Sequence, residues 1–157
     1  SRADPSFTSA AFGLARCQRR RGDRAGAVAA LERVAASSSR YETARVAMAD
    51  VLLDDDPRPP TEPELARAAE VLAQMEGAAM LAVHRLAARL LLDAARSLEE
   101  DGAGSGGGPL LGIPRQAAAL RAGAERELRT CAHLAPTRAE RVQYVDEANR
   151  ARPFTLV

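Results

Sequence analysis

Apolar residues recur along this chain at helical spacing, in short segments that each have a start and a stop. In the second such segment the apolar positions lie at offsets of three, four and seven, a spacing that places them on one face of an α-helix. Asp23 stands where an N-cap residue accepts a hydrogen bond from the first turn, and Gly22 suits the end of a preceding helix. The apolar positions are Ala27, Ala30, Leu31 and Val34.

The first segment predicts a helix that pairs with the second. In Asp4-Pro5-Ser6, the aspartate and serine side chains can accept hydrogen bonds from amides of the first turn, and the proline has no amide donor to satisfy. Arg19-Arg20-Arg21 places cations at the negative end of the helix dipole. We expect Phe7, Ala11, Leu14 and Ala15 to form its buried face.

Five further segments predict five further helices. Capping boxes of Ser39 with Glu42 and of Thr61 with Glu64 begin the third and fourth, the fifth spans about 78–100, the sixth starts near Arg115, and Thr137 with Glu140 begins the last. The fifth is apolar on more than one side, so we expect it to be central. The expected core residues are Tyr41, Ala44, Met48, Val51, Leu52, Leu65, Ala68, Ala69, Leu72, Met75, Met80, Leu81, Val83, Leu86, Leu90, Leu92, Ala94, Leu120, Ala124, Leu128, Cys131, Val142, Val145 and Ala148.

Two interruptions separate these helices. Asp54-Asp55-Asp56 and the prolines at 57, 59 and 60 predict an extended connection. A glycine-rich stretch predicts a flexible loop at about 101–114. Seven helices without a strand predict an all-α fold of antiparallel hairpins, in one domain over residues 1–157.

The composition agrees with a helical protein and limits the classes of partner that we expect. Aromatic residues make up 3%, and all 22 basic residues are arginine. The net charge of +1 gives no reason to expect nucleic acid or acidic lipid as a partner. No apolar run approaches the ~20 residues of a membrane span, and no signal peptide opens the chain. Because it starts without methionine, we expect a fragment of a larger protein. We expect that protein to be cytoplasmic.

The first two helices have the spacing of a tetratricopeptide repeat of about 34 residues. Small residues at Ala15 and Ala27 let two helices touch, and Gly22 permits a tight turn between them. The matching positions are Leu14, Ala15, Gly22, Ala27, Leu31 and Val34; the departures are Ala11 for tryptophan, Gln18 for tyrosine and Ser39 for proline. The hairpins are therefore expected to stack as a tetratricopeptide-like right-handed solenoid, although the later pairs are degenerate.

Five segments carry a resemblance to a known family: Asp4–Arg16, Gly22–Leu31, Ser38–Tyr41, Leu134–Arg141 and Asn149–Leu156. Through them the chain resembles the C-terminal tetratricopeptide region of the actinobacterial protein kinase G family of serine/threonine kinases. The glycine-rich stretch has no counterpart. The resemblance implies a domain that follows an ATP-dependent kinase domain, contacts that domain or a second copy in a homodimer, and helps to position protein substrates. It also implies a link to the control of glutamate and 2-oxoglutarate metabolism.

Three features could indicate chemistry, and each has a simpler interpretation. Gly102, Gly104 and Gly107 match the spacing of a phosphate-binding loop, but no strand precedes them. The chain lacks lysine, which excludes a P-loop and the ATP-positioning lysine of a kinase. Arg19-Arg20-Arg21 could contact phosphate, and Asp54-Asp55-Asp56 could bind a cation. For both triplets we prefer the simpler interpretation of a helix end exposed to solvent.

Soft metal ligands are few. A zinc site would need Cys17, His84, Cys131 and His133 to converge without a Cys-x-x-Cys pair, and both cysteines lie near apolar stripes. No nucleophile and base share a supporting motif. We therefore predict no catalytic, cofactor-binding or metal-binding residue.

Three functions remain in order of preference. The first is a non-catalytic interaction, dimerisation and regulatory domain of a bacterial serine/threonine kinase. The second is a free-standing tetratricopeptide adaptor that binds peptides, and the third is a helical enzyme or metal protein. Phe7 and Phe12 cannot both face the partner helix, and Phe154-Thr155-Leu156-Val157 is apolar, so we expect self-association through these surfaces.

Overall fold

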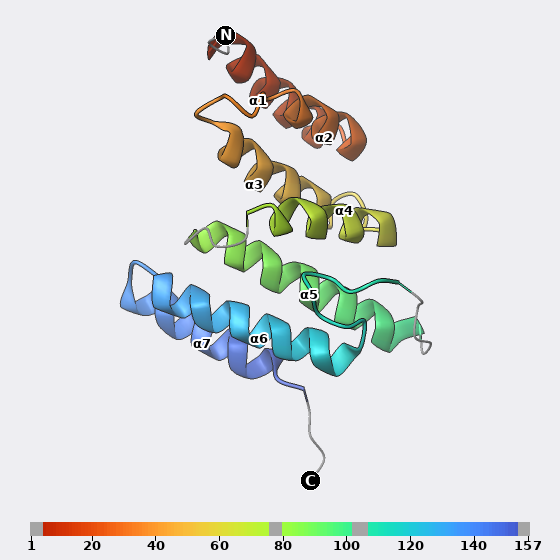
Figure 1. The fold of residues 1–157 in the computed structure, drawn as a ribbon, viewed down its shortest axis with the longest axis vertical. Coiled ribbons are helices and arrows are strands. Elements are labelled where there is room, and N and C mark those ends of the chain that lie inside the picture. The colour runs from red at the N-terminus through yellow and green to blue at the C-terminus, as the bar shows by residue number, and fades with distance from the viewer. Residues whose placement is uncertain (1–4, 76–79, 102–106, 154–157) are drawn as a thin grey trace. The chain divides into compact units, whose positions relative to one another are not determined.

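The structure is a computed structural model that describes residues 5–75, 80–101 and 107–153 (Figure 1). Within these residues every regular secondary-structure element is a helix. The helices are α1 (Pro5–Arg20), α2 (Arg24–Glu32), α3 (Tyr41–Leu52), α4 (Glu62–Ala73), α5 (Leu81–Asp101), α6 (Ala117–Leu134) and α7 (Arg138–Ala151). The prediction of an all-α fold with seven helices is confirmed.

The chain divides into two compact units, Ser1–Met75 and Glu76–Val157. In the first unit α1 packs on α2, α2 on α3, and α3 on α4; in the second, α6 packs on both α5 and α7. Each unit has its own core of alanine and leucine side chains. A single domain over residues 1–157 stays a prediction.

The turn between α1 and α2 forms as its sequence predicts. Gly22 has a φ of 73°, in the region that favours glycine, and lies two residues after the end of α1. Asp23 is the N-cap of α2, and its Oδ1 accepts a hydrogen bond of 2.8 Å from the amide of Gly26. The helices approach closely because Ala15 and Ala27 are both buried.

The predicted inner face of α1 is wrong at its two largest residues. Phe7 is 53% exposed and Leu14 is 42% exposed, whereas Ala11 and Ala15 are buried together with Thr8. Phe7 and Leu14 each precede a buried residue by one position, which is a rotation of about 100° around a helix. The buried face is therefore the face with small residues, and the bulky side chains point away from the core.

Three of the remaining helices are predicted to start at a capping pair, and two of these pairs form. The capping boxes of Thr61 with Glu64 and of Thr137 with Glu140 are present at the starts of α4 and α7. The capping box predicted for Ser39 and Glu42 is wrong, because Arg40 occupies the N-cap of α3 without a side-chain hydrogen bond.

The second unit begins its second helix after a tight turn. Leu110 and Ile113 exchange backbone hydrogen bonds, and Leu110 is buried. Ile113 lies so close to Gly123 of α6 that a Cβ at this glycine would collide with its side chain. The end of the predicted flexible loop is therefore a defined turn held against α6.

The predicted core face of α7 is also wrong in part. Val142 is 53% exposed and Val145 is 37% exposed, whereas Ala148 and Ala151 are buried. Within the second unit α7 packs against α6, so a narrow strip of small residues is enough to cover its inner face. The two valines add to the exposed apolar surface of this unit.

Candidate protein-interaction site

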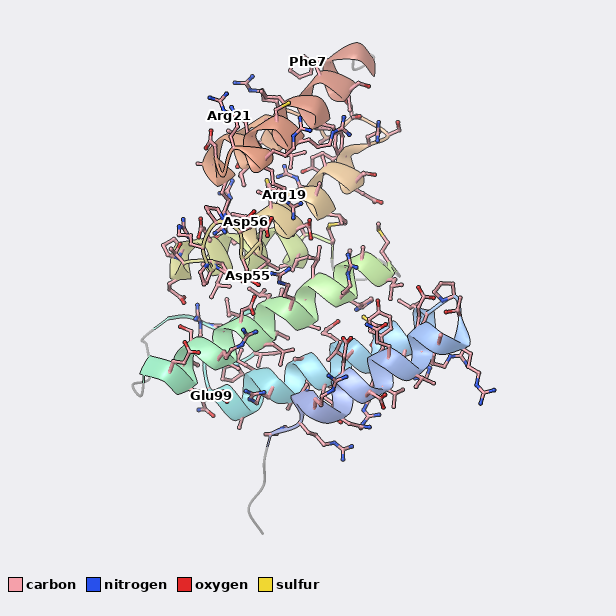
Figure 2. All side chains as sticks on the ribbon, turned by 180° about the vertical axis from the view of Figure 1, so that it is seen from behind. Phe7, Arg19, Arg21, Asp55, Asp56 and Glu99 are labelled. Carbon is pink, nitrogen blue, oxygen red and sulfur yellow. The ribbon has the colours of Figure 1, made fainter. Side chains whose placement is uncertain are left out.

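The outer side of α1 carries a row of exposed apolar residues, which we call the α1 stripe. It consists of Phe7, Ala10, Leu14 and Cys17, at successive offsets of three, four and three residues. This is the spacing by which a helix presents one seam to another helix. Phe7 lies on this outer side (Figure 2). Phe7 and Leu14 are about half exposed, which shows that no helix of the described residues covers the stripe.

Phe12 differs from Phe7 in its surroundings. The guanidinium carbon of Arg40 lies 4.7 Å from the centroid of the Phe12 ring, so this ring is partly covered within the unit. The sequence predicts that the two rings cannot both face the partner helix, and Phe7 is the one left exposed. Phe154–Val157, the second apolar segment of that prediction, lies outside the described residues.

The end of α1 is tied to the end of α3 rather than free in solvent. The Arg19 guanidinium donates to Oδ2 of Asp50 and to Oδ2 of Asp54, each at 2.7 Å. Arg19 and Asp54 therefore pair with each other, while the Arg19 side chain stays 43% exposed to solvent. Pairing inside the unit also lowers their availability to phosphate or a cation.

A second ion-pair cluster, which the sequence did not predict, lies in the same unit. Arg24 is 7% exposed and donates from Nη1 to Oε2 of Glu64 at 2.9 Å. Its Nη2 donates to the carbonyl oxygens of Asp54 and Arg58. Hydrogen bonds from Arg58 lower the pKa of Glu64 to about 2, because they favour its charged form. The available signal was that Arg24 precedes Leu31 by seven residues and so shares its buried face.

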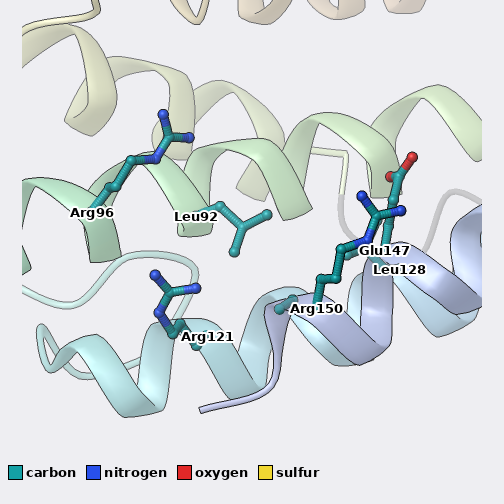
Figure 3. A pocket seen from close by; sticks show the side chains of 7 residues that line it. Leu92, Arg96, Arg121, Leu128, Glu147 and Arg150 are labelled. Carbon is teal, nitrogen blue, oxygen red and sulfur yellow. The ribbon is translucent and has the colours of Figure 1, made fainter. Parts of the chain in front are cut away.

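The second unit contains a hollow of about 290 Å³ between α5, α6 and α7 (Figure 3). Its lining combines apolar side chains with three arginines and one glutamate. The lining residues are Leu92, Arg96, Arg121, Leu128, Glu147, Arg150 and Ala151. The hollow is thus concave, and charged residues make up more than half of its lining.

The soft metal ligands have separate surroundings. His84 Nδ1 lies 2.6 Å from Oε2 of Glu127, Cys131 is buried, and His133 is exposed, all in the second unit; Cys17 is exposed in the first. Burial raises the pKa of Cys131 to about 11, so its thiol is protonated at neutral pH. No group of three histidine, cysteine, aspartate or glutamate side chains that could hold a metal ion occurs among the described residues.

The glycine motif is only partly described. Gly102 and Gly104 lie outside the described residues, and Gly107 lies close to the Arg115 side chain. In the part of the chain with described structure, no helix is both long and apolar enough to span a bilayer.

The exposed α1 stripe, the repeat-like hairpin and the lining of the hollow together suggest a binding domain, and comparison with known proteins identifies its family. The family described as Protein kinase G tetratricopeptide repeat matches residues 1–155. The chain belongs to this family. The resemblance found in the sequence is thus confirmed, as is the tetratricopeptide-like fold of this protein kinase G repeat.

Two relatives of this protein kinase G repeat bear the name serine/threonine-protein kinase PknG. The protein from Mycobacterium leprae is 38% identical, over 95% of this chain and 19% of its own length. The protein from Mycolicibacterium smegmatis is 35% identical, over 97% of this chain and 20% of its own length. The chain thus spans about a fifth of the length of these relatives.

Proposed function

We propose that this domain is the non-catalytic interaction scaffold of a bacterial serine/threonine protein kinase in the cytoplasm, and that it supports dimerisation and regulation of that kinase. The observation that carries the proposal is the α1 stripe. Phe7 and Leu14 are large apolar side chains exposed on one seam of a helix, at the spacing that a second helix covers. Such a seam is stabilised when a partner removes it from water.

The kinase part of the proposal rests on the names of the two relatives and on the family. The chain itself contains no lysine, so the lysine that positions ATP in a kinase must lie elsewhere in the parent protein. A kinase domain encoded directly upstream in the same reading frame is the expected result of sequencing the gene. A reading frame limited to this domain would contradict it.

The partner of the α1 stripe is either the kinase domain of the same protein or a second copy of this domain, and protein substrates are positioned by the assembly. In the isolated chain only a second copy is available. The interaction is therefore expected to appear as a dimer when the concentration of the isolated chain is high.

The test measures mass by light scattering after size exclusion, under reducing conditions, for the chain and two variants. Leu14→Ser removes the centre of the α1 stripe and should shift the mass toward the monomer. Val142→Ser changes an exposed apolar residue on α7, 53% exposed against 42% for Leu14, and should leave the mass unchanged.

The same variants distinguish the two partners. If the chain is monomeric throughout, the upstream kinase domain added as a separate protein should bind the chain and fail to bind Leu14→Ser. Neither a dimer nor binding to the kinase domain, or equal behaviour of Leu14→Ser and the parent chain, contradicts the proposal. Circular dichroism checks that both variants remain helical.

A further inference from the structure

The α1 stripe is followed by an arginine at the same helical spacing. Arg21 comes four residues after Cys17, so the alternation of three and four residues continues from the apolar positions onto a cation. The amide of Arg21 donates to the carbonyl oxygen of Cys17 at 3.2 Å, as in a helix, and Arg21 is exposed. Phe7 and Arg21 therefore mark the two ends of one seam, and both are labelled in Figure 2.

Arg20 lies beside Arg21, and we call these two residues the basic end of the stripe. The Nη2 of Arg20 donates to Sγ of Cys17 at 3.7 Å, which places the guanidinium at the edge of the stripe. A thiol is a weak and uncharged acceptor, so this contact leaves the charge of Arg20 unbalanced. Neither arginine forms an ion pair with another described residue.

The carboxylates of the first unit do not pair with the basic end. α1 contains no aspartate or glutamate, and Asp50 and Asp54 bind Arg19 on the side of α1 that faces α3. In the described part of the chain, no residue of the acidic run 54–56 pairs with Arg20 or Arg21. Asp23 caps the N-terminus of α2, whose partial positive charge it balances. The partial negative charge at the end of α1 is about half a unit, which two guanidinium groups exceed.

Two possible occupants of the stripe do not complement this surface. A second α1 carries the same arginines and no carboxylate, so it adds like charge and offers the basic end no partner. A lipid surface needs a broad apolar face, whereas Phe7 and Leu14 are the only large apolar side chains of the stripe. The smaller Ala10 and Cys17 leave recesses between them, and such recesses accept the large side chains of another helix.

We propose that the α1 stripe binds an acidic amphipathic helix of a partner protein. Large apolar side chains of that helix pack over Ala10 and Cys17, and aspartate or glutamate at its flank pairs with Arg20 and Arg21. The apolar seam and the uncompensated cations at its end support this occupant together. The inference rests on the proposed function and deepens it, because it states the chemistry of the partner and excludes α1 of a second copy.

The test uses the whole chain under reducing conditions and a fluorescein-labelled helical peptide of about three heptads. The peptide has leucine at its a and d positions and glutamate at its e and g positions, and the control peptide has glutamine in place of glutamate. Both peptides stay at trace concentration, so that they remain monomeric while fluorescence anisotropy measures their binding. We expect the glutamate peptide to bind about tenfold more tightly than the glutamine peptide, and the difference to shrink as salt screens the charges.

Variants of the chain locate the binding. Arg20→Gln/Arg21→Gln should weaken binding of the glutamate peptide about tenfold and leave binding of the glutamine peptide unchanged. Arg20→Lys/Arg21→Lys keeps the charge and should retain most of the preference for glutamate. Arg138→Gln/Arg141→Gln makes the same charge change at exposed positions of α7 and should bind like the parent chain. Circular dichroism and the melting temperature show whether each variant is folded, and the comparison of the two peptides on the parent chain needs no variant.

Equal binding of the two peptides by the parent chain, or unchanged binding of the glutamate peptide by Arg20→Gln/Arg21→Gln, would overturn this assignment. A dimer of the isolated chain that tightens in this double variant would also overturn it, because relief of repulsion would place two α1 helices against each other. Binding to phosphatidylglycerol vesicles but to neither peptide would assign the stripe to lipid instead. Leu14→Ser tests the proposed function separately: if it weakens both peptides while the arginine variants change neither, the α1 stripe stands and only its acidic partner is wrong.

Discussion

Arg24 of α2 donates a hydrogen bond of 2.9 Å to Glu64 of α4, forty positions later in the chain. The same guanidinium binds two carbonyl oxygens of the connection between α3 and α4. One buried arginine therefore joins three parts of the first unit. It satisfies backbone acceptors of an extended, proline-rich segment that has no secondary structure of its own to do so.

Removing this arginine should destabilise the first unit strongly. Arg24→Ala leaves Glu64 with one charge partner fewer and leaves two carbonyl groups without their donor, so we expect a loss of about 3 kcal/mol in the free energy of unfolding. Arg67→Ala removes an exposed ion pair with Glu32 and should cost about 0–1 kcal/mol. Urea unfolding measures both, and equal losses would show that the burial of Arg24 is unimportant.

The pairing of Glu64 should make the first unit sensitive to acid. Hydrogen bonds from Arg58 hold its pKa at about 2 in the folded chain, below the ordinary value of 4.5. A carboxyl group whose pKa is lower in the folded chain than in the unfolded chain stabilises the fold. This stabilisation is fully present above the pKa of the unfolded chain and is lost as pH falls from about 5 to about 2. Between pH 7 and pH 3, the free energy of unfolding measured in urea should therefore fall less in Glu64→Gln than in the parent chain. An identical pH dependence of the two proteins would contradict this assignment.

Local signals predicted the helix boundaries better than the helix faces. The caps at Asp23, Thr61 and Thr137 depend on residues within one turn, and all three are present. Which face of α1 is buried depends on how closely α2 approaches. Small residues of α1 occupy the contact with α2, so Leu14 is exposed although its size favours burial.

The hollow of the second unit could not be predicted from spacing. Leu92, Arg121 and Arg150 come from three helices, and only the packing of α5 and α7 on α6 brings them together. A pattern within one helix indicates its buried face and carries no information on which side chains of other helices surround the same space. The lack of a carboxylate partner for Arg150 is likewise visible only in three dimensions.

Two glycines of the first hairpin should respond to alanine with opposite signs. Gly13 lies inside α1, and a Cβ there meets nothing within 4 Å, so Gly13→Ala should stabilise the chain by up to about 1 kcal/mol. Gly22 has a φ of 73°, where a Cβ is strained, so Gly22→Ala should destabilise it by about 1–2 kcal/mol. Melting temperatures that change in the same direction for both variants would contradict the turn geometry.

The two cysteines should differ sharply in reactivity, and the difference reports on the α1 stripe. Cys131 is buried with its pKa raised to about 11, so both access and thiolate content protect it; Cys17 is exposed on the stripe. Iodoacetamide at pH 8 should add one label to the folded chain, at Cys17, and a second after unfolding in urea. Mass spectrometry counts the labels, and Cys17→Ser should take none while folded.

If a second copy or the kinase domain covers the α1 stripe, labelling of Cys17 should slow as that partner is added, whereas Leu14→Ser should keep the fast rate. The comparison separates burial by a partner from burial within the domain, because Leu14 and Cys17 are both outside the core of the unit. Rapid labelling of Cys131 in the folded chain would contradict its burial. A Cys17 rate that is independent of every partner would place the interaction on another surface.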